Sequence, residues 1–182
     1  MAIKATIYKA TIQLSDMDRN YYQTLSLTIA QHPSETDRRM MVRILAYILN
    51  AEDNLQFTKG LSEDDEPEIW LKDYSDVIKL WVDLGQIDEK RIKKGCSRGQ
   101  QMRLYSYGSS VDIWWSKIKN KLSAFSNLSV IKINEETCEQ LVTLVDRTME
   151  LQCSIDSGQI WLGNNETTVH IEPEVLLEQG NH

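Results

Sequence analysis

Two acidic residues, Glu68 and Asp83, lie in segments whose alternation is typical of half-buried strands. Glu68 opens segment 68–72, and Asp83 comes near the end of the mostly apolar segment 77–84. The connection between these segments is short enough for adjacent strands, which would bring the two carboxylates together. A pair of carboxylates can hold a hard cation such as Mg²⁺. A single Asp at a strand end is also typical of a turn or of a hydrogen-bonded polar group, so both interpretations stay open.

Basic residues follow Asp83 closely along the chain. They are Lys90, Arg91, Lys93 and Lys94, with Arg98 and Arg103 behind them. Beside a metal-bound phosphate, a lysine can stabilise the charge that develops in phosphoryl transfer. Lys93 and Lys94 follow the apolar Ile92, so either could turn toward the sheet. Lys90 and Arg91 are more typical of a solvated helical face.

The sequence lacks the residue patterns of several other kinds of functional site. The three histidines have no metal-ligand spacing, and the chain contains no GxSxG, Walker-type or GxGxxG motif. The three cysteines, Cys96, Cys138 and Cys153, form no CxxC pair and predict free thiols in a reducing cytoplasm. A net charge of -7 argues against a protein that coats nucleic acid by bulk charge, but it allows a local basic groove.

The remaining pattern predicts one α/β domain over residues 1–182. No signal peptide is expected at the N-terminus, and no apolar run is long enough to cross a bilayer. The expected strands cover 3–12 and 21–29 as an N-terminal β-hairpin, then 55–58, 68–72, 77–84, 101–107, 128–133, 152–155, 159–162 and 169–171. The expected helices cover 34–49, 88–94 or slightly beyond, 108–125, and a segment from Asn134 to about Met149. Together they predict a mixed sheet flanked by helices.

Several blocks of this sequence jointly resemble the YaeQ family of bacterial proteins, over nearly the whole chain. The blocks are Met1–Ala10, His32–Thr36, Phe57–Leu61, Asp65–Trp70, Leu80–Gly85, Arg91–Lys94, Asp146–Met149 and Ile160–Leu162. The resemblance implies a restriction-endonuclease-like fold, that of the PD-(D/E)xK nucleases. The nuclease-like core would cover about 34–107, in the order helix, three strands, helix, strand.

The resemblance also implies roles for particular residues. Glu35 matches the acid of the first core helix, Glu68 the acid of the second motif, and Asp83 the acid of the (D/E)xK motif. These three would hold Mg²⁺. The motif lysine is replaced by Gly85, and Lys94, or its neighbour Lys93, would take its place from the following helix.

Two functions follow from that resemblance. The first is a Mg²⁺-dependent phosphodiesterase that acts on nucleic acid. The alternative is a catalytically inactive binding or regulatory module, linked to transcription and to a protein partner. Neither the oligomeric state nor a preference for DNA or RNA follows from the sequence.

Overall fold

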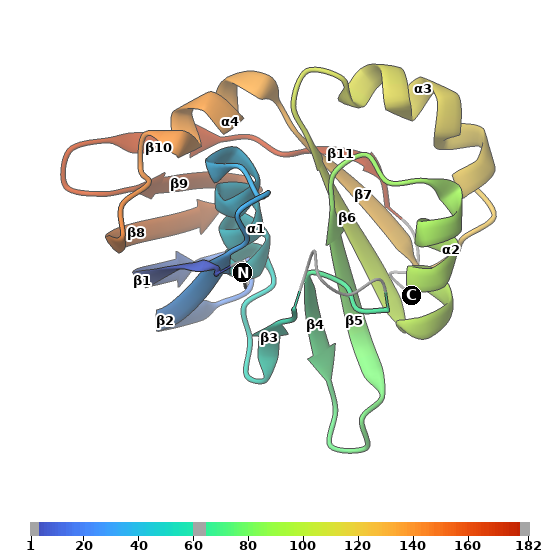
Figure 1. Ribbon diagram of the computed structural model, residues 1–182, viewed down its shortest axis with the longest axis horizontal. Helices are drawn as coiled ribbons and strands as arrows, with labels where there is room; N and C mark the ends of the chain where they lie inside the picture. The colour runs from blue at the N-terminus through green and yellow to red at the C-terminus, as the bar shows by residue number, and fades with distance from the viewer. Residues whose placement is uncertain (1–3, 60–64, 179–182) are drawn as a thin grey trace. The chain divides into compact units, whose positions relative to one another are not determined.

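The computed structural model describes residues 4–59 and 65–178, and within them the chain forms four helices, eleven strands and two mixed sheets (Figure 1). The residues divide into two compact units. The first consists of Met1–Val42 and Glu135–Pro173, and the second of Arg43–Asn134 and Glu174–His182. Helix α1 (Asp37–Leu49) begins in the first unit and ends in the second.

The first unit is built on a five-stranded sheet in the order β10-β9-β8-β1-β2. β1 pairs antiparallel with β2 and parallel with β8, while β9 and β10 complete the sheet as antiparallel neighbours. One face is apolar and buried, and the other carries Thr, Ser and Gln side chains because strand residues alternate between faces. The elements are β1 (Thr6–Asp16), β2 (Tyr21–Gln31), α1 (Asp37–Leu49), α4 (Glu135–Val142), β8 (Thr148–Asp156), β9 (Gln159–Gly163) and β10 (Thr168–Ile171).

The second unit is built on a six-stranded sheet in the order β11-β7-β6-β5-β4-β3. β3, β4 and β5 are antiparallel, whereas β5, β6 and β7 are parallel and are joined through α2 and α3. Both helices pack on a shared apolar cluster that includes Trp81, Ile92, Met102 and Leu128. The elements are β3 (Leu55–Phe57), β4 (Ile69–Lys72), β5 (Ile78–Leu84), α2 (Glu89–Arg98), β6 (Gln101–Tyr107), α3 (Val111–Leu122), β7 (Leu128–Ile133) and β11 (Glu174–Leu177).

The predicted class and element order are confirmed, from the N-terminal hairpin through the helix, three strands, helix and strand of 34–107. Ile3, the first residue of the expected hairpin, lies outside the described residues. Three features differ from the expectation. The strands form two sheets instead of one, the strand β11 was not expected, and the helix from Asn134 ends at Val142.

The shortened helix α4 has a visible cause. Residues 148–156 alternate between exposed and buried positions, with Met149, Leu151, Cys153 and Ile155 all pointing into the core. This period of two is that of a strand, so Met149 belongs to β8 and not to the helix.

The predicted free thiols are confirmed: Cys96 is half-buried, Cys138 and Cys153 are buried, and none is in a disulfide. Within the described residues, no helix is both long enough and apolar enough to cross a membrane.

Candidate functional site

Asp83 lies on β5 of the second unit, and Glu68 immediately precedes the neighbouring strand β4. Ile69 of β4 is opposite Val82 of β5, so the next residues outward on the two strands are Glu68 and Asp83. The backbone N–H of Glu68 donates to the carbonyl of Val82 at 2.9 Å. Both acids are buried, with exposed fractions of 6% and 2%. The strand adjacency inferred from the sequence is therefore present.

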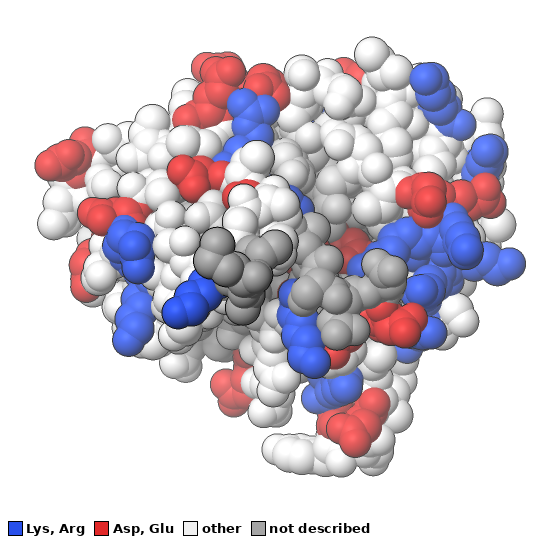
Figure 2. Space-filling view, viewed as in Figure 1, with Lys and Arg blue, Asp and Glu red and all other residues white. Residues whose placement is uncertain are grey.

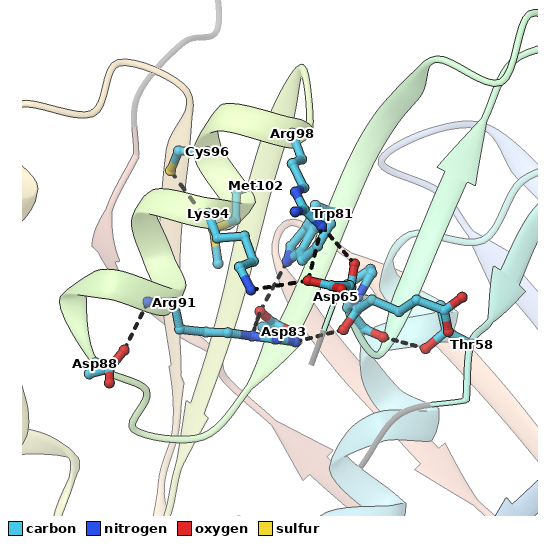
Figure 3. A network of polar contacts seen from close by, with 12 residues as sticks. Thr58, Asp65, Trp81, Asp83, Asp88, Arg91, Lys94, Cys96, Arg98 and Met102 are labelled. Carbon is cyan, nitrogen blue, oxygen red and sulfur yellow. Dashed lines mark hydrogen bonds and ion pairs between the residues drawn. The ribbon is translucent and has the colours of Figure 1, made fainter. Parts of the chain in front are cut away.

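The carboxylate of Asp83 has donors on both oxygens. The indole Nε1 of Trp81, two residues earlier on the same face of β5, donates to Oδ2 at 3.0 Å. Arg91 donates from Nε to Oδ2 at 3.0 Å and from Nη2 to Oδ1 at 3.1 Å (Figure 3). This two-bonded arrangement is the strong geometry for an arginine and a carboxylate.

Arg91 is positioned by the start of α2. Asp88 caps that helix, and its carboxylate accepts from the backbone N–H of Arg91 at 2.8 Å. The guanidinium also donates from Nη2 to the carbonyl of Glu66 at 2.7 Å. Arg91 thus joins β5, α2 and the segment that precedes β4.

Two further cations of α2 reach the same segment. Lys94 Nζ lies 3.3 Å from Asp65 Oδ1, and Arg98 Nη1 lies 3.1 Å from the Asp65 carbonyl (Figure 3). Arg91, Lys94 and Arg98 are spaced by three and four residues and therefore share one side of the helix. Lys93 is exposed on a different side. Of the two lysines proposed to replace the motif lysine, Lys94 is the one on the side of Asp83.

Gly85 stands at the position where the resemblance would lead us to expect a lysine, and its conformation excludes one for a physical reason. Its φ is +95°, a left-handed conformation that residues with a side chain rarely adopt. Its N–H donates to the carbonyl of Tyr105 at 2.8 Å, which holds this turn at the end of β5. A lysine at position 85 would strain the backbone here.

Glu35 belongs to the first unit and lies just before α1. Arg39, four residues later, donates from Nη1 to Glu35 Oε2 at 2.6 Å, and the glutamate side chain is only 2% exposed. Each of the predicted metal ligands is thus buried, and both Glu35 and Asp83 are in ion pairs with arginine.

The donor set is poor for a metal ion. In the described parts of the chain, no group of three or more His, Cys, Asp or Glu side chains is arranged to hold one. Glu68 and Asp83 are hard oxygen donors of the kind that Mg²⁺ prefers, but a metal on Asp83 would have to displace Arg91.

Cys96, also on α2, does not add a nucleophile to this site. Burial raises the pKa of its thiol to about 11, so the thiol stays protonated at neutral pH. Its sulfur contacts Met102 Sδ at 3.8 Å, within the apolar layer beneath the helix.

Sequence reasoning missed three contributors to this site: Arg91, Trp81 as a hydrogen-bond donor, and Asp65. The i, i+2 spacing of Trp81 and Asp83 on one strand face was a usable signal for their contact. Arg91 had no comparable signal, because its helical position fits a solvated face equally well.

The comparisons with known proteins agree on one family. The YaeQ protein family model matches residues 1–173. The chain belongs to the YaeQ family. A curated relative, the uncharacterised YaeQ of Escherichia coli strain K12, is 46% identical over 172 residues, which cover 94% of this chain and 95% of the relative. The uncharacterised YaeQ of Salmonella typhi is 46% identical over 173 residues, which cover 94% and 96%.

Two crystal structures of YaeQ proteins share this fold. The one from Xanthomonas axonopodis pv. citri is 43% identical with a TM-score of 0.91, and the match covers 94% of this chain and 98% of that one. The one from Pseudomonas syringae is 30% identical with a TM-score of 0.92, covering 96% and 97%. In each comparison, the shared fold therefore extends over nearly all of this chain and nearly all of the crystallised YaeQ protein.

Proposed function

We propose that this protein is a non-catalytic member of the nuclease-like fold and that it binds the phosphate backbone of nucleic acid through α2. The single observation that supports the non-catalytic part is the state of Asp83. Both of its carboxylate oxygens accept hydrogen bonds from Arg91, and Oδ2 also accepts one from Trp81. A buried carboxylate satisfied in this way serves to hold structure, and Gly85 leaves no motif lysine beside it.

The binding part of the proposal rests on the charge of α2. Its ten residues hold five of the 20 Lys and Arg residues of a chain whose net charge is -7. Figure 2 shows Lys and Arg side chains gathered over the position of α2, at the right of the view. Arg91, Lys94 and Arg98 contact the chain itself, whereas Lys90 and Lys93 are exposed three residues apart on one face.

Lys90 and Lys93 are thus the cations that would contact phosphates. Such contacts release counterions, so affinity falls as salt rises, and each contact adds about one unit to the slope of log K against log salt. They carry no sequence information, which predicts binding to DNA and RNA alike.

Fluorescence anisotropy with a labelled DNA duplex and a labelled RNA tests this proposal. The variant Lys90→Glu/Lys93→Glu should weaken binding at least tenfold and make the salt slope shallower by about two units. The matched control Lys9→Glu/Lys79→Glu makes the same change in net charge at exposed lysines outside α2. Absence of binding by the wild type at low salt, or equal losses in both variants, would refute the assignment to α2.

A Mg²⁺-dependent phosphodiesterase is the second candidate, and the adjacency of the buried Glu68 and Asp83 favours it. In this function Glu68 and Asp83 would hold Mg²⁺, which would polarise the phosphate and lower the pKa of a bound water. Lys94, or Lys93, would stabilise the developing negative charge. Arg91 would have to release Asp83 for this to occur.

Metal titration and cleavage assays separate the two candidates. For the phosphodiesterase, calorimetry should detect Mg²⁺ binding, and labelled DNA or RNA should be cleaved in Mg²⁺ but not in EDTA. Both signals should be lost in Asp83→Ala and kept in Asp16→Ala, whose buried acid lies in the other unit. For the binding module, anisotropy should report binding in EDTA, with no cleavage in Mg²⁺ or Mn²⁺. Circular dichroism of each variant checks that it has folded.

A further inference from the structure

The strand β2 ends the sheet of the first unit with a long and continuous edge. It spans 11 residues, Tyr21–Gln31, and pairs with β1 in unbroken register along its whole length. Among the described strands, none pairs with its other side. Edge strands of this kind offer backbone N–H and C=O groups to another strand, and natural proteins usually blunt them with charge, proline, bulges or short length.

β2 has none of these protections. Its sequence, YYQTLSLTIAQ, contains no charged residue, no proline and no glycine, and the pairing shows no bulge. Its middle side chains Thr24, Ser26 and Thr28 are exposed on the polar face of the sheet.

The other described sheet edges are protected. β10 has four residues, includes His170 and is followed at once by Glu172, and β3 has only three residues. β11 has four residues, begins with Glu174 and shifts register between Val175 and Leu177. The lack of protection is therefore specific to β2.

We infer that β2 pairs antiparallel with the β2 strand of a second copy of this chain, joining two five-stranded sheets into one continuous sheet. A twofold axis through the middle of the strand, at Ser26, brings identical sequences together in opposite directions. Because β2 carries no charge, two copies of it can pair without like-charge repulsion. A partner recognised through opposite charge would not require an uncharged strand.

The alternation of β2 suits this self-pairing. Leu25, Leu27 and Ile29 turn to the apolar face of the sheet, and Thr24 and Ser26 to the polar face. Antiparallel pairing about Ser26 keeps residues of the same face together, so the apolar face and the polar face both continue across the junction. This inference concerns the first unit and does not depend on nucleic-acid binding by α2.

Sedimentation velocity over a range of protein concentrations tests the inference. The wild type should sediment with twice the mass of the chain, and Thr24→Lys/Ser26→Lys should raise the dimer dissociation constant at least tenfold, because like charges then face each other across the axis. The matched control is Thr11→Lys/Gln13→Lys. It changes the residues of β1 that stand directly opposite Ser26 and Thr24 on the same face, and it should leave the dimer intact.

A charge exchange makes the test specific. Thr24→Glu/Ser26→Glu should also be monomeric alone, and an equal mixture of the Lys and Glu variants should restore the dimer. Hydrogen exchange should show that those amides of residues 22–29 that point away from β1 are protected in the wild type and lose protection in each single preparation, while the amides bonded to β1 stay protected.

Several outcomes would overturn the inference. They are a wild type that stays monomeric at all concentrations, a dimer that the β2 substitutions leave unchanged, and a dimer in which the amides of residues 22–29 that point away from β1 exchange as fast as unbonded amides. Circular dichroism shows whether the variants keep the fold, so that a lost dimer is not mistaken for unfolding.

Discussion

Two buried aspartates, Asp16 in the first unit and Asp83 in the second, satisfy their charge in different ways. Each is 2% exposed, lies at or near the end of a strand and pairs with an arginine. Asp16 takes its partner from the adjoining turn: Arg19, three residues on, donates from its backbone N–H at 3.1 Å and from Nε at 2.6 Å. Asp83 takes its partner from the next helix, eight residues on.

The difference lies in what each pair holds together. The pair of Asp16 and Arg19 closes one hairpin turn, and the arginine side chain is 35% exposed. Arg91 is 24% exposed and joins α2 to β5 and to the backbone of Glu66. A buried ion pair stabilises a fold only where its desolvated charges are fully hydrogen-bonded, and removing one partner leaves the other charge buried and uncompensated. Loss of Arg91 should therefore lower the stability of the protein more than loss of Arg19.

The largest expected effect follows from removing each arginine. Arg91→Met should lower the free energy of unfolding by about 3–5 kcal/mol, because it leaves the Asp83 charge buried without its cation. Arg19→Met should cost about 1–2 kcal/mol, because the backbone N–H of residue 19 still donates to Asp16 and water reaches the turn. Urea unfolding followed by circular dichroism measures both. Equal losses would show that the two pairs contribute alike to stability.

A double-mutant cycle isolates the pair energies themselves. The cycle of Asp83→Asn with Arg91→Met should give a coupling energy of about 2–3 kcal/mol, and that of Asp16→Asn with Arg19→Met about 0.5–1 kcal/mol. The same urea experiments supply all values. A coupling near zero at Asp83 would mean that Arg91 stabilises the fold through Glu66 instead.

A smaller effect is expected from the second donor to Asp83. Trp81→Phe removes the Nε1 hydrogen bond from a fully buried side chain but leaves both Arg91 bonds, so it should cost about 1–2 kcal/mol. In the background of Asp83→Asn, the hydrogen-bond part of that loss should shrink. An undiminished loss would assign the effect to packing alone.

The smallest expected effect concerns one thiol in each unit. Burial raises the pKa of Cys96 to about 11, and burial together with the Asp16 carboxylate raises that of Cys153 to about 12. Iodoacetamide labelling followed by mass spectrometry should find Cys153 the slower of the two at alkaline pH. Asp16→Asn should speed the labelling of Cys153 and leave Cys96 unchanged.

The raised thiol pKa values also set a direction for stability. An unfolded thiol ionises near pH 9, while the buried thiol stays protonated, so unfolding becomes easier as pH rises. The contribution of the two buried thiols to the free energy of unfolding is fully present below about pH 8.5 and is lost as the pH approaches 11 to 12. Stability that rises across this range would contradict the burial of Cys96 and Cys153.

Much of the second unit could be predicted from local signals. The alternation in 68–72 and 77–84, and the short connection between them, were enough to predict that these two segments are neighbouring strands. The cap at Asp88 with the basic residues after it predicted α2. The helix from Asn134 was predicted too long because Val145 and Met149 also fit a helical period, while the strand period of 148–156 proved decisive.

By itself, the sequence determined most of the elements and the local pairs of this protein, because alternation, helix caps and turn residues act over a few neighbours. Asp16 and Arg19 are a pair of this local kind. The tertiary structure decided which arginine meets Asp83, that the strands divide into two sheets, and that β2 is left as an edge. These features depend on how a helix rotates against its sheet and on which strands pair over long separations. Alternative rotations of the helix and alternative strand pairings have the same local sequence pattern. They differ only in their long-range contacts, which the local pattern does not specify.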